Sequence, residues 1–252
     1  MPILHFSFDD VAYTLHDLCS STYDSAFDQP FLHDLRIIHQ DTGAVFTLYC
    51  FNRCTALPDY DIAHLPDRYR EELSAASQWL RFGFHAEDDL ARYAETPDVL
   101  TAFLRSHDAL MHFAGKQSID TFLRLGFFSG NQSAVDTLHT AGVRGLYAAD
   151  DLRLSYALTQ TENDQVIHHG VYRDAAGMVY IRTQPRLDTH TALEVIAAVE
   201  SNPAYRPLTE VFLHEYSYLR DPAIFRQRIE DVAHWANSQG YTHRFHSDEV
   251  IE

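Results

Sequence analysis

Ionisable side chains that could do chemistry follow several apolar stretches of this 252-residue sequence. Taken one at a time, acids after a strand are typical of loops and helix caps, and a histidine there is often structural. Taken together, imidazole and carboxylate groups suit a divalent ion that activates water for hydrolysis. The residues are Asp9, Asp10, His85, Asp89, Arg124, Asp150, Asp151 and His214.

The spacing of these residues favours a metal centre. His85 and Asp89 are four residues apart, so on one helical turn both would reach the same ion. We expect Asp10 to supply a third ligand and its neighbour Asp9 to remain free as a base.

Short β-rich runs alternate with helical stretches along the chain, which predicts a parallel sheet with right-handed crossovers. The expected helices begin at residues 66, 97, 131 and 221 and end near 80, 113, 142 and 240. The expected strands are residues 3–8, 44–51, 81–85, 121–128, 145–149, 178–183, 210–215 and 241–245.

About eight such units favour an α/β barrel, distorted or incomplete, as one domain over residues 1–252. In barrel enzymes the carboxyl ends of the strands carry the active site, and the ionisable residues above fall at these ends. Residues 155–180 read as an inserted hairpin, and residues 11–29 as either a lid or a packed loop.

Composition excludes some partners. The chain has 19 Lys+Arg against 36 Asp+Glu, a formal net charge of -17, and shows no basic run. Such a charge repels nucleic acid and anionic membranes. No stretch is apolar enough to span a bilayer and no signal-peptide pattern precedes the first strand, so we expect a cytoplasmic protein, with a secreted mature form as the open alternative.

The motifs, in their order, resemble those of the polysaccharide deacetylase (NodB homology) superfamily. The likeness covers Ser7 to Glu215 and rests on Phe8-Asp9-Asp10, His85-x-x-x-Asp89, Arg124 and Phe212-Leu213-His214. It implies a distorted (β/α) barrel that removes N- or O-linked acetyl groups from a carbohydrate with a divalent metal: zinc, or else cobalt, nickel or manganese.

The resemblance also implies roles for individual residues. Asp9 is the expected base, Arg124 orients it, and His214 is the general acid. The expected metal ligands are Asp10, His85 and Asp89, and an acidic motif at Asp150 or Asp151 supports the site.

This sequence departs from the family pattern at four places. Val11 stands where the family has glycine, Asp89 replaces a ligand histidine, Arg-x-Pro-Tyr becomes Arg124-Leu-Gly-Phe127, and the late Leu-x-His becomes Phe212-Leu213-His214, a milder change. Two alternatives therefore stay open: a catalytically degenerate barrel that binds carbohydrate, and a metal-independent glycoside hydrolase that uses Asp9 or Asp10 with Glu215.

Aromatic residues and further histidines lie outside these motifs. Aromatic rings near the strand ends could stack on sugars or pack in the core. For His168, His169, His243 and His246 we expect surface or packing roles rather than an adventitious metal site.

Overall fold

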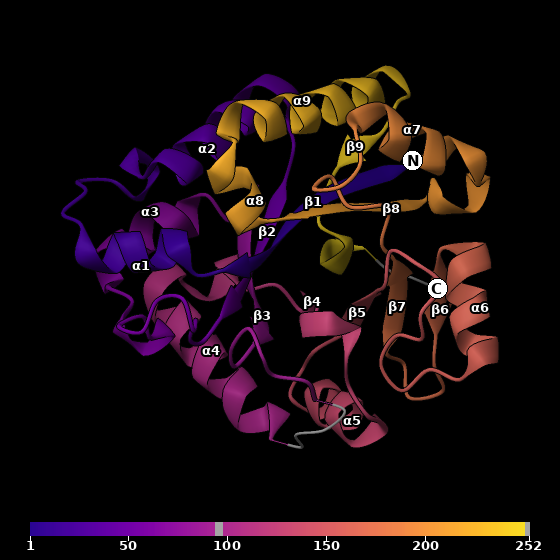
Figure 1. Ribbon diagram of the computed structural model, residues 1–252, viewed down its shortest axis with the longest axis horizontal. Coiled ribbons are helices and arrows are strands. Elements are labelled where there is room, and N and C mark those ends of the chain that lie inside the picture. The colour runs from indigo at the N-terminus through magenta and orange to yellow at the C-terminus, as the bar shows by residue number, and fades with distance from the viewer. Residues whose placement is uncertain (94–97, 250–252) are drawn as a thin grey trace.

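The computed structural model describes residues 1–93 and 98–249 (Figure 1). Its strands form two sheets, and helices surround them. The first sheet has the order β3-β2-β1-β8 with β9 beside β1, and the second has the order β4-β5-β7-β6. The strands are β1 Ile3–Val11, β2 Phe46–Phe51, β3 Leu80–Ala86, β4 Phe122–Leu123, β5 Gly145–Ala148, β6 Val171–Arg173, β7 Val179–Arg182, β8 Leu208–His214 and β9 Thr242–His243.

Every strand pair is parallel except β6 with β7. Isolated parallel bridges join the two sheets at both seams, Phe82 to Ile119 beside β3 and Thr183 to Glu210 beside β8. The predicted α/β class and distorted barrel are therefore confirmed, with a hydrogen-bond ladder that is not continuous around the ring.

The helices connect successive strands on the outside of the barrel (Figure 1). Several begin with a side-chain cap that the sequence made visible: Asp98, Asn131 and Asp221 each accept a bond from a backbone amide of the first turn. The helices are α1 Tyr13–Ser20, α2 Pro30–Thr42, α3 Arg70–Ala75, α4 Val99–Ala114, α5 Gln132–Thr140, α6 Gln160–His169, α7 Ala192–Ser201, α8 Glu215–Arg220 and α9 Pro222–Ser238.

The two faces of β1 have different environments. Phe8 packs edge-on against Phe31 of α2, with ring centroids 4.8 Å apart, and against Tyr218 of α8. His5 and Ser7 alternate with the apolar residues and are also fully buried, on the face inside the barrel. Burying polar groups in a central strand costs free energy unless they are bonded, so this face needs partners from other strands.

The expected hairpin over residues 155–180 is wrong in its first half. Residues 160–169 form α6, because Thr159 and Glu162 make a capping box and Gly170 ends the helix in a left-handed conformation. The antiparallel hairpin is β6 with β7, and its turn spans Asp174 to Gly177 as expected.

Other expected boundaries also change. The strand expected over 121–128 ends at Leu123, since Phe127 and Phe128 have φ of 59° and 55° and cannot continue a ladder. The helix expected from 66 to 80 ends at Ala75, because Leu80 already pairs with Phe46 in the sheet. Pro97 lies outside the described residues.

The segment 11–29 is not an open loop. It contains α1, whose Leu15 and Leu18 are fully buried, and a short 3-10 turn, Ala26–Asp28, with a capping box from Ser25. The segment is therefore packed against the rest of the fold through these residues.

Candidate functional site

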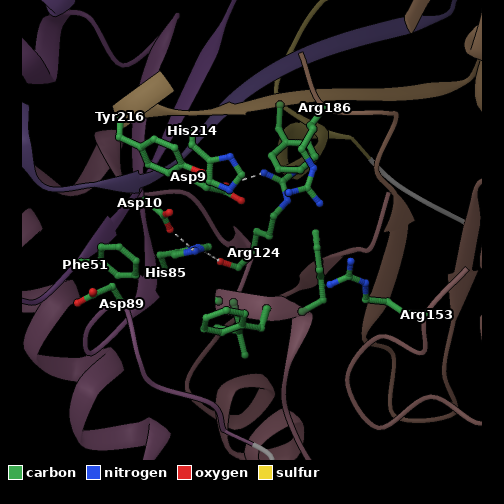
Figure 2. Close-up of a pocket in the computed structure, with 15 residues that line it drawn as sticks. Asp9, Asp10, Phe51, His85, Asp89, Arg124, Arg153, Arg186, His214 and Tyr216 are labelled. Carbon is green, nitrogen blue, oxygen red and sulfur yellow. Dashed lines mark hydrogen bonds and ion pairs between the residues drawn. The ribbon is translucent and has the colours of Figure 1, made fainter. Parts of the chain in front are cut away.

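A pocket of about 270 Å³ lies at the carboxyl ends of the parallel strands (Figure 2). It is the place where the barrel architecture predicts a site. Two arginines that the sequence did not single out, Arg153 and Arg186, line it as well. The expected site residues that line it are Asp9, Asp10, His85, Asp89, Arg124 and His214.

An irregularity in β1 brings both aspartates into this pocket. In a regular strand, consecutive side chains point to opposite faces. Here the register with β2 shifts between Phe8 and Val11, and Asp10 has a left-handed φ of 60°. This bulge turns the Asp10 side chain toward the side that Asp9 already faces. Val11, the departure from glycine, is fully buried as the last residue of the strand.

Asp10 and His85 form the closest pair of expected metal ligands. His85 Nδ1 lies 2.6 Å from the carbonyl oxygen of Arg124, which can only accept, so Nδ1 carries a proton. His85 Nε2 then faces Asp10 Oδ1 at 3.2 Å. Burial alone would lower the pKa of His85, but the Asp9 and Asp10 carboxylates outweigh it and raise that pKa. Burial alone would raise the pKa of Asp10, and His85 reverses that shift.

Asp9 is bound by the buried guanidinium of Arg124. Arg124 Nη1 donates to Asp9 Oδ1 at 2.8 Å and to Ser7 Oγ at 2.7 Å. Arg124 is 0% exposed and Asp9 only 3% exposed. The carboxylate therefore has a fixed cationic partner and a defined orientation in the pocket.

His214 lies beside Asp9 and has its own carboxylate, which the sequence did not reveal. The two residues are register partners on β8 and β1. Asp188, in the loop after β7, accepts from His214 Nδ1 at 2.6 Å and from its backbone amide at 3.1 Å. Burial lowers the pKa of His214, but the hydrogen bond to Asp188 and the charge of Asp9 outweigh it, so that pKa is raised.

This pair gives a pH prediction. If protonated His214 is the general acid, activity falls as pH rises through its raised pKa. Asp188→Asn removes one charge that raises the pKa, so we expect the basic limb of the kcat/KM profile to move to lower pH. Asp231→Asn, on the outer face of α9, removes the same charge and should leave the profile in place. An unshifted limb in Asp188→Asn would contradict the assignment of His214.

Asp89 lies at the edge of the pocket, and its carboxylate is engaged elsewhere. It accepts from Thr55 Oγ1 at 2.5 Å and from the Thr55 backbone amide at 3.0 Å. Figure 2 shows this carboxylate turned away from Asp10 and His85. Residues 87–91 form no helix in the structure, so the shared helical face expected for His85 and Asp89 does not exist.

Asp150 and Asp151 support the pocket indirectly. Asp150 binds Arg186 through both carboxylate oxygens, each 2.9 Å from its partner, and Asp151 pairs with Arg153. Both arginines line the pocket. The acidic pair thus orients two cations at the mouth and does not contact Arg124.

Glu215 is placed where it cannot act on a substrate. It is fully buried and accepts from the backbone amides of Ala12, Tyr13 and Thr14 at 2.7 to 2.9 Å. It therefore anchors the start of α1 to the start of α8. Its burial raises its pKa.

We expect Glu215→Gln to weaken folding and to spare catalysis. An amide oxygen accepts less strongly than a carboxylate, and the amide NH₂ faces donors, so the free energy of unfolding should fall by about 1–3 kcal/mol. Urea unfolding and kcat of the folded variant measure the two effects. A folded variant that loses kcat would contradict this purely structural role for Glu215.

No protein-family model matches this chain, and no curated protein sequence matches it. Similar folds occur among solved structures. A polysaccharide deacetylase from Bacillus cereus superposes with a TM-score of 0.55 at 11% identity, over 100% of this chain and 96% of the other. A putative polysaccharide deacetylase from Mycobacterium smegmatis gives 0.52 at 14% identity, over 99% and 94%.

A third similar structure contains a metal. It is a family 4 acetyl xylan esterase from Clostridium thermocellum in complex with a cobalt ion, with a TM-score of 0.51 at 11% identity over 95% of this chain and 86% of the other. At these identities the comparisons show the fold. The resemblance drawn from the motifs is therefore confirmed at the level of the fold.

Proposed function

We propose that this chain, which has the fold of the polysaccharide deacetylases, is a metal-dependent hydrolase that removes acetyl groups from a carbohydrate. One observation carries the proposal: a candidate base and a candidate acid, each held by its own ion-pair partner, meet in one pocket. Asp9 is held by Arg124 and His214 by Asp188, and Asp9 and His214 are neighbours on β1 and β8, next to Asp10 and His85.

The Asp10–His85 pair fits a divalent ion. Two donors at about 2.1 Å from one tetrahedral ion lie about 3.4 Å apart, close to the 3.2 Å between Asp10 Oδ1 and His85 Nε2. The carbonyl bonded to His85 Nδ1 leaves Nε2 as the ligand atom. Asp89 would join them by exchanging its bonds to Thr55. When bound, such an ion, zinc or else cobalt, nickel or manganese, supplies Lewis-acid polarisation of the acetyl carbonyl.

The chain's own groups supply the proton transfers. Asp9 takes a proton from the attacking water, and Arg124 holds its carboxylate in place for that step. Backbone amides of residues 125–127, which line the pocket, are the candidates for stabilising the tetrahedral oxyanion. His214 gives its proton to the leaving amine or alkoxide, and Asp188 stabilises the imidazolium before that transfer.

Aromatic side chains at the pocket support a carbohydrate as the substrate. Phe51, Phe127 and Tyr216 line it, and Phe127 and Tyr216 are each 47% exposed. Exposed rings beside a polar pocket stack on the apolar faces of sugar rings. An acetylated carbohydrate is therefore the substrate class that the site favours.

Acetate release tests the proposal. The purified protein is incubated with acetylated chitooligosaccharides and with acetylated xylan, before and after treatment with a chelator and after addition of zinc or cobalt. We expect acetate from at least one substrate, loss of release on chelation, and recovery with metal. Hydrolysis of glycosidic bonds that survives chelation would contradict it.

One observation favours the second candidate, a barrel that binds carbohydrate without turnover. Asp89 is bonded to Thr55 and not to the Asp10–His85 pair, so two expected ligands, not three, are in contact. In that case the sugar would bind with the same affinity in the parent and in Asp10→Asn, and neither would release acetate. Calorimetric titration with the acetylated oligosaccharide distinguishes the two candidates.

A further inference from the structure

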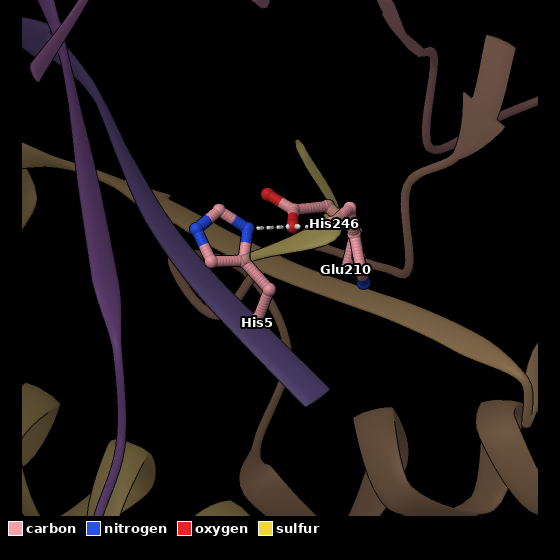
Figure 3. Close-up of side chains that lie close together, drawn as sticks. All are labelled: His5, Glu210 and His246. Atoms are coloured by element: carbon pink, nitrogen blue, oxygen red, sulfur yellow. Dashed lines mark hydrogen bonds and ion pairs between the residues drawn. The ribbon is translucent and has the colours of Figure 1, made fainter. Parts of the chain in front are cut away.

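A second cluster of ionisable side chains is buried among the strands and does not line the pocket (Figure 3). His5 of β1 and Glu210 of β8 are register partners, and His246 approaches them from the C-terminal segment. All three residues are 0% exposed. The cluster is separate from the expected metal ligands, and the reaction proposed above does not use it.

The residue types in this cluster are those of a metal site, but the contacts between them leave no space for an ion. His5 Nδ1 lies 2.5 Å from Glu210 Oε2, well inside the roughly 3.4 Å that separates two donors on one ion. Glu210 Oε1 accepts from Arg124 Nη2 at 2.7 Å and from Ser7 Oγ at 2.5 Å. A divalent cation would have to displace the proton between His5 and Glu210. It would also lie beside the Arg124 guanidinium, and the repulsion between these two positive charges opposes its binding.

Hydrogen-bond directions place the extra proton on His5. The hydroxyl of Thr47 donates its only proton to Asp120 Oδ2 at 2.8 Å, so it must accept from His5 Nε2, 2.9 Å away. Glu210 Oε1 accepts from both Arg124 Nη2 and Ser7 Oγ, and the ion pair with Arg124 favours the carboxylate, so Oε2 accepts from His5 Nδ1. Both ring nitrogens of His5 then carry protons.

The remaining members of the cluster are consistent with this distribution of protons. Burial and the charge of His5 lower the pKa of His246 to about 3, which keeps its ring neutral. Its Nδ1 lies 3.1 Å from the Tyr147 hydroxyl, a hydrogen bond that a neutral ring can make. The cluster therefore holds one imidazolium, and His5 is the ring that carries it.

We propose that Glu210, paired with a buried His5 imidazolium, is a positioning residue that fixes the Arg124 guanidinium against Asp9. The chain of contacts is continuous: His5 to Glu210, Glu210 to Arg124 Nη2, and Arg124 Nη1 to Asp9. The planar guanidinium binds one carboxylate with each terminal nitrogen, so the position of Glu210 sets the orientation of the guanidinium plane relative to Asp9. The catalytic consequence rests on the proposed function, whereas the protonation of His5 does not.

Nuclear magnetic resonance of the parent protein tests the first part. In a sample labelled with ¹⁵N-histidine, and assigned with His5→Gln, we expect both ring nitrogens of His5 to be protonated at pH 7. We also expect a strongly downfield proton between His5 and Glu210. A single protonated nitrogen on His5 would overturn the proposal, and this measurement needs neither turnover nor a folded Glu210 variant.

The Glu210→Gln variant tests the second part. It keeps the size of the side chain and removes its charge, so we expect kcat to fall about 10- to 100-fold with KM unchanged. The ¹⁵N-arginine signals of the Arg124 guanidinium should lose their slow exchange. Glu71→Gln removes the same charge from an exposed site on α3 and should change neither. An unchanged kcat in folded Glu210→Gln would overturn the positioning role.

These readouts separate the failure of this inference from the failure of the proposed function. If the parent releases no acetate, the proposed function fails, and the His5 and Arg124 signals still decide the inference. Slow Arg124 exchange that is lost in Glu210→Gln then supports it, and exchange that does not change overturns it.

Discussion

The Asp9→Asn variant is expected to lose about 10²- to 10⁴-fold in kcat, the contribution of a positioned general base. Asparagine keeps the shape of the side chain and can still accept from Arg124 at the site of Asp9 Oδ1. It cannot take a proton from water. Initial rates of acetate release, with KM measured on the same substrate, give the effect, and we expect KM to change much less than kcat.

Asp108→Asn is the matched control, because the Asp108 side chain in α4 is 76% exposed and its loss removes the same charge. We expect this variant to keep the parent's rate. Full turnover by folded Asp9→Asn would show that another group accepts the proton, and the assignment of Asp9 would be wrong.

The Arg124→Met variant is expected to cost about 3–5 kcal/mol of the free energy of unfolding. Methionine fills much of the same volume, but it leaves the buried carboxylates of Asp9 and Glu210 without the cation that lies 2.8 and 2.7 Å from them. Urea unfolding at pH 7 measures the loss. Arg153→Met is the control, since the Arg153 side chain is 48% exposed and its ion pair with Asp151 should contribute little.

The stability of the parent should also depend on pH through Glu210. Its pKa is lowered from 4.5 to about 2, with burial opposing the shift and His5 and Arg124 outweighing it. A lowered pKa means that ionised Glu210 stabilises the fold above pH 4.5, and that this contribution is lost as pH falls from 4.5 to 2. In Arg124→Met the slope over this range should be smaller, and an equal slope would contradict the pairing.

The sequence predicted most of the parallel strands in their order along the chain, because short apolar runs bounded by helix caps are local signals. It missed α1, α2, α6, α7 and α8, although the capping boxes at Thr159 and Thr191 are local signals for α6 and α7. It also overextended the strand at residues 121–128, since nothing local marks the left-handed Phe127 and Phe128.

The candidate site was predictable where a residue follows a strand in the expected order. Asp9, Asp10, His85, Arg124 and His214 all reach one pocket, while their catalytic roles stay predictions. Asp89 shows what spacing alone cannot predict: two residues four apart share a face only on a helix, and residues 87–91 are not helical.

Asp188 and Glu210 were missed for different reasons. Asp188 lies in a loop, and only the tertiary fold brings it to His214. For Glu210, the sequence does contain an indication. Buried parallel strands are usually continuous apolar runs, and the alternation of His5, Ser7 and Asp9 in one strand, opposite Glu210 in another, breaks that rule. Such breaks indicate a polar barrel interior.

The central claim is that one divalent ion binds at Asp10 and His85, beside Asp9. Anomalous diffraction from crystals soaked in zinc or cobalt tests it most directly, with the Asp10→Asn variant soaked in parallel. We predict a single strong peak within about 2.0–2.3 Å of Asp10 and of His85 Nε2, with Asp89 turned toward it, and no peak in the variant. A peak elsewhere, or none in the parent at saturating metal, would contradict the account.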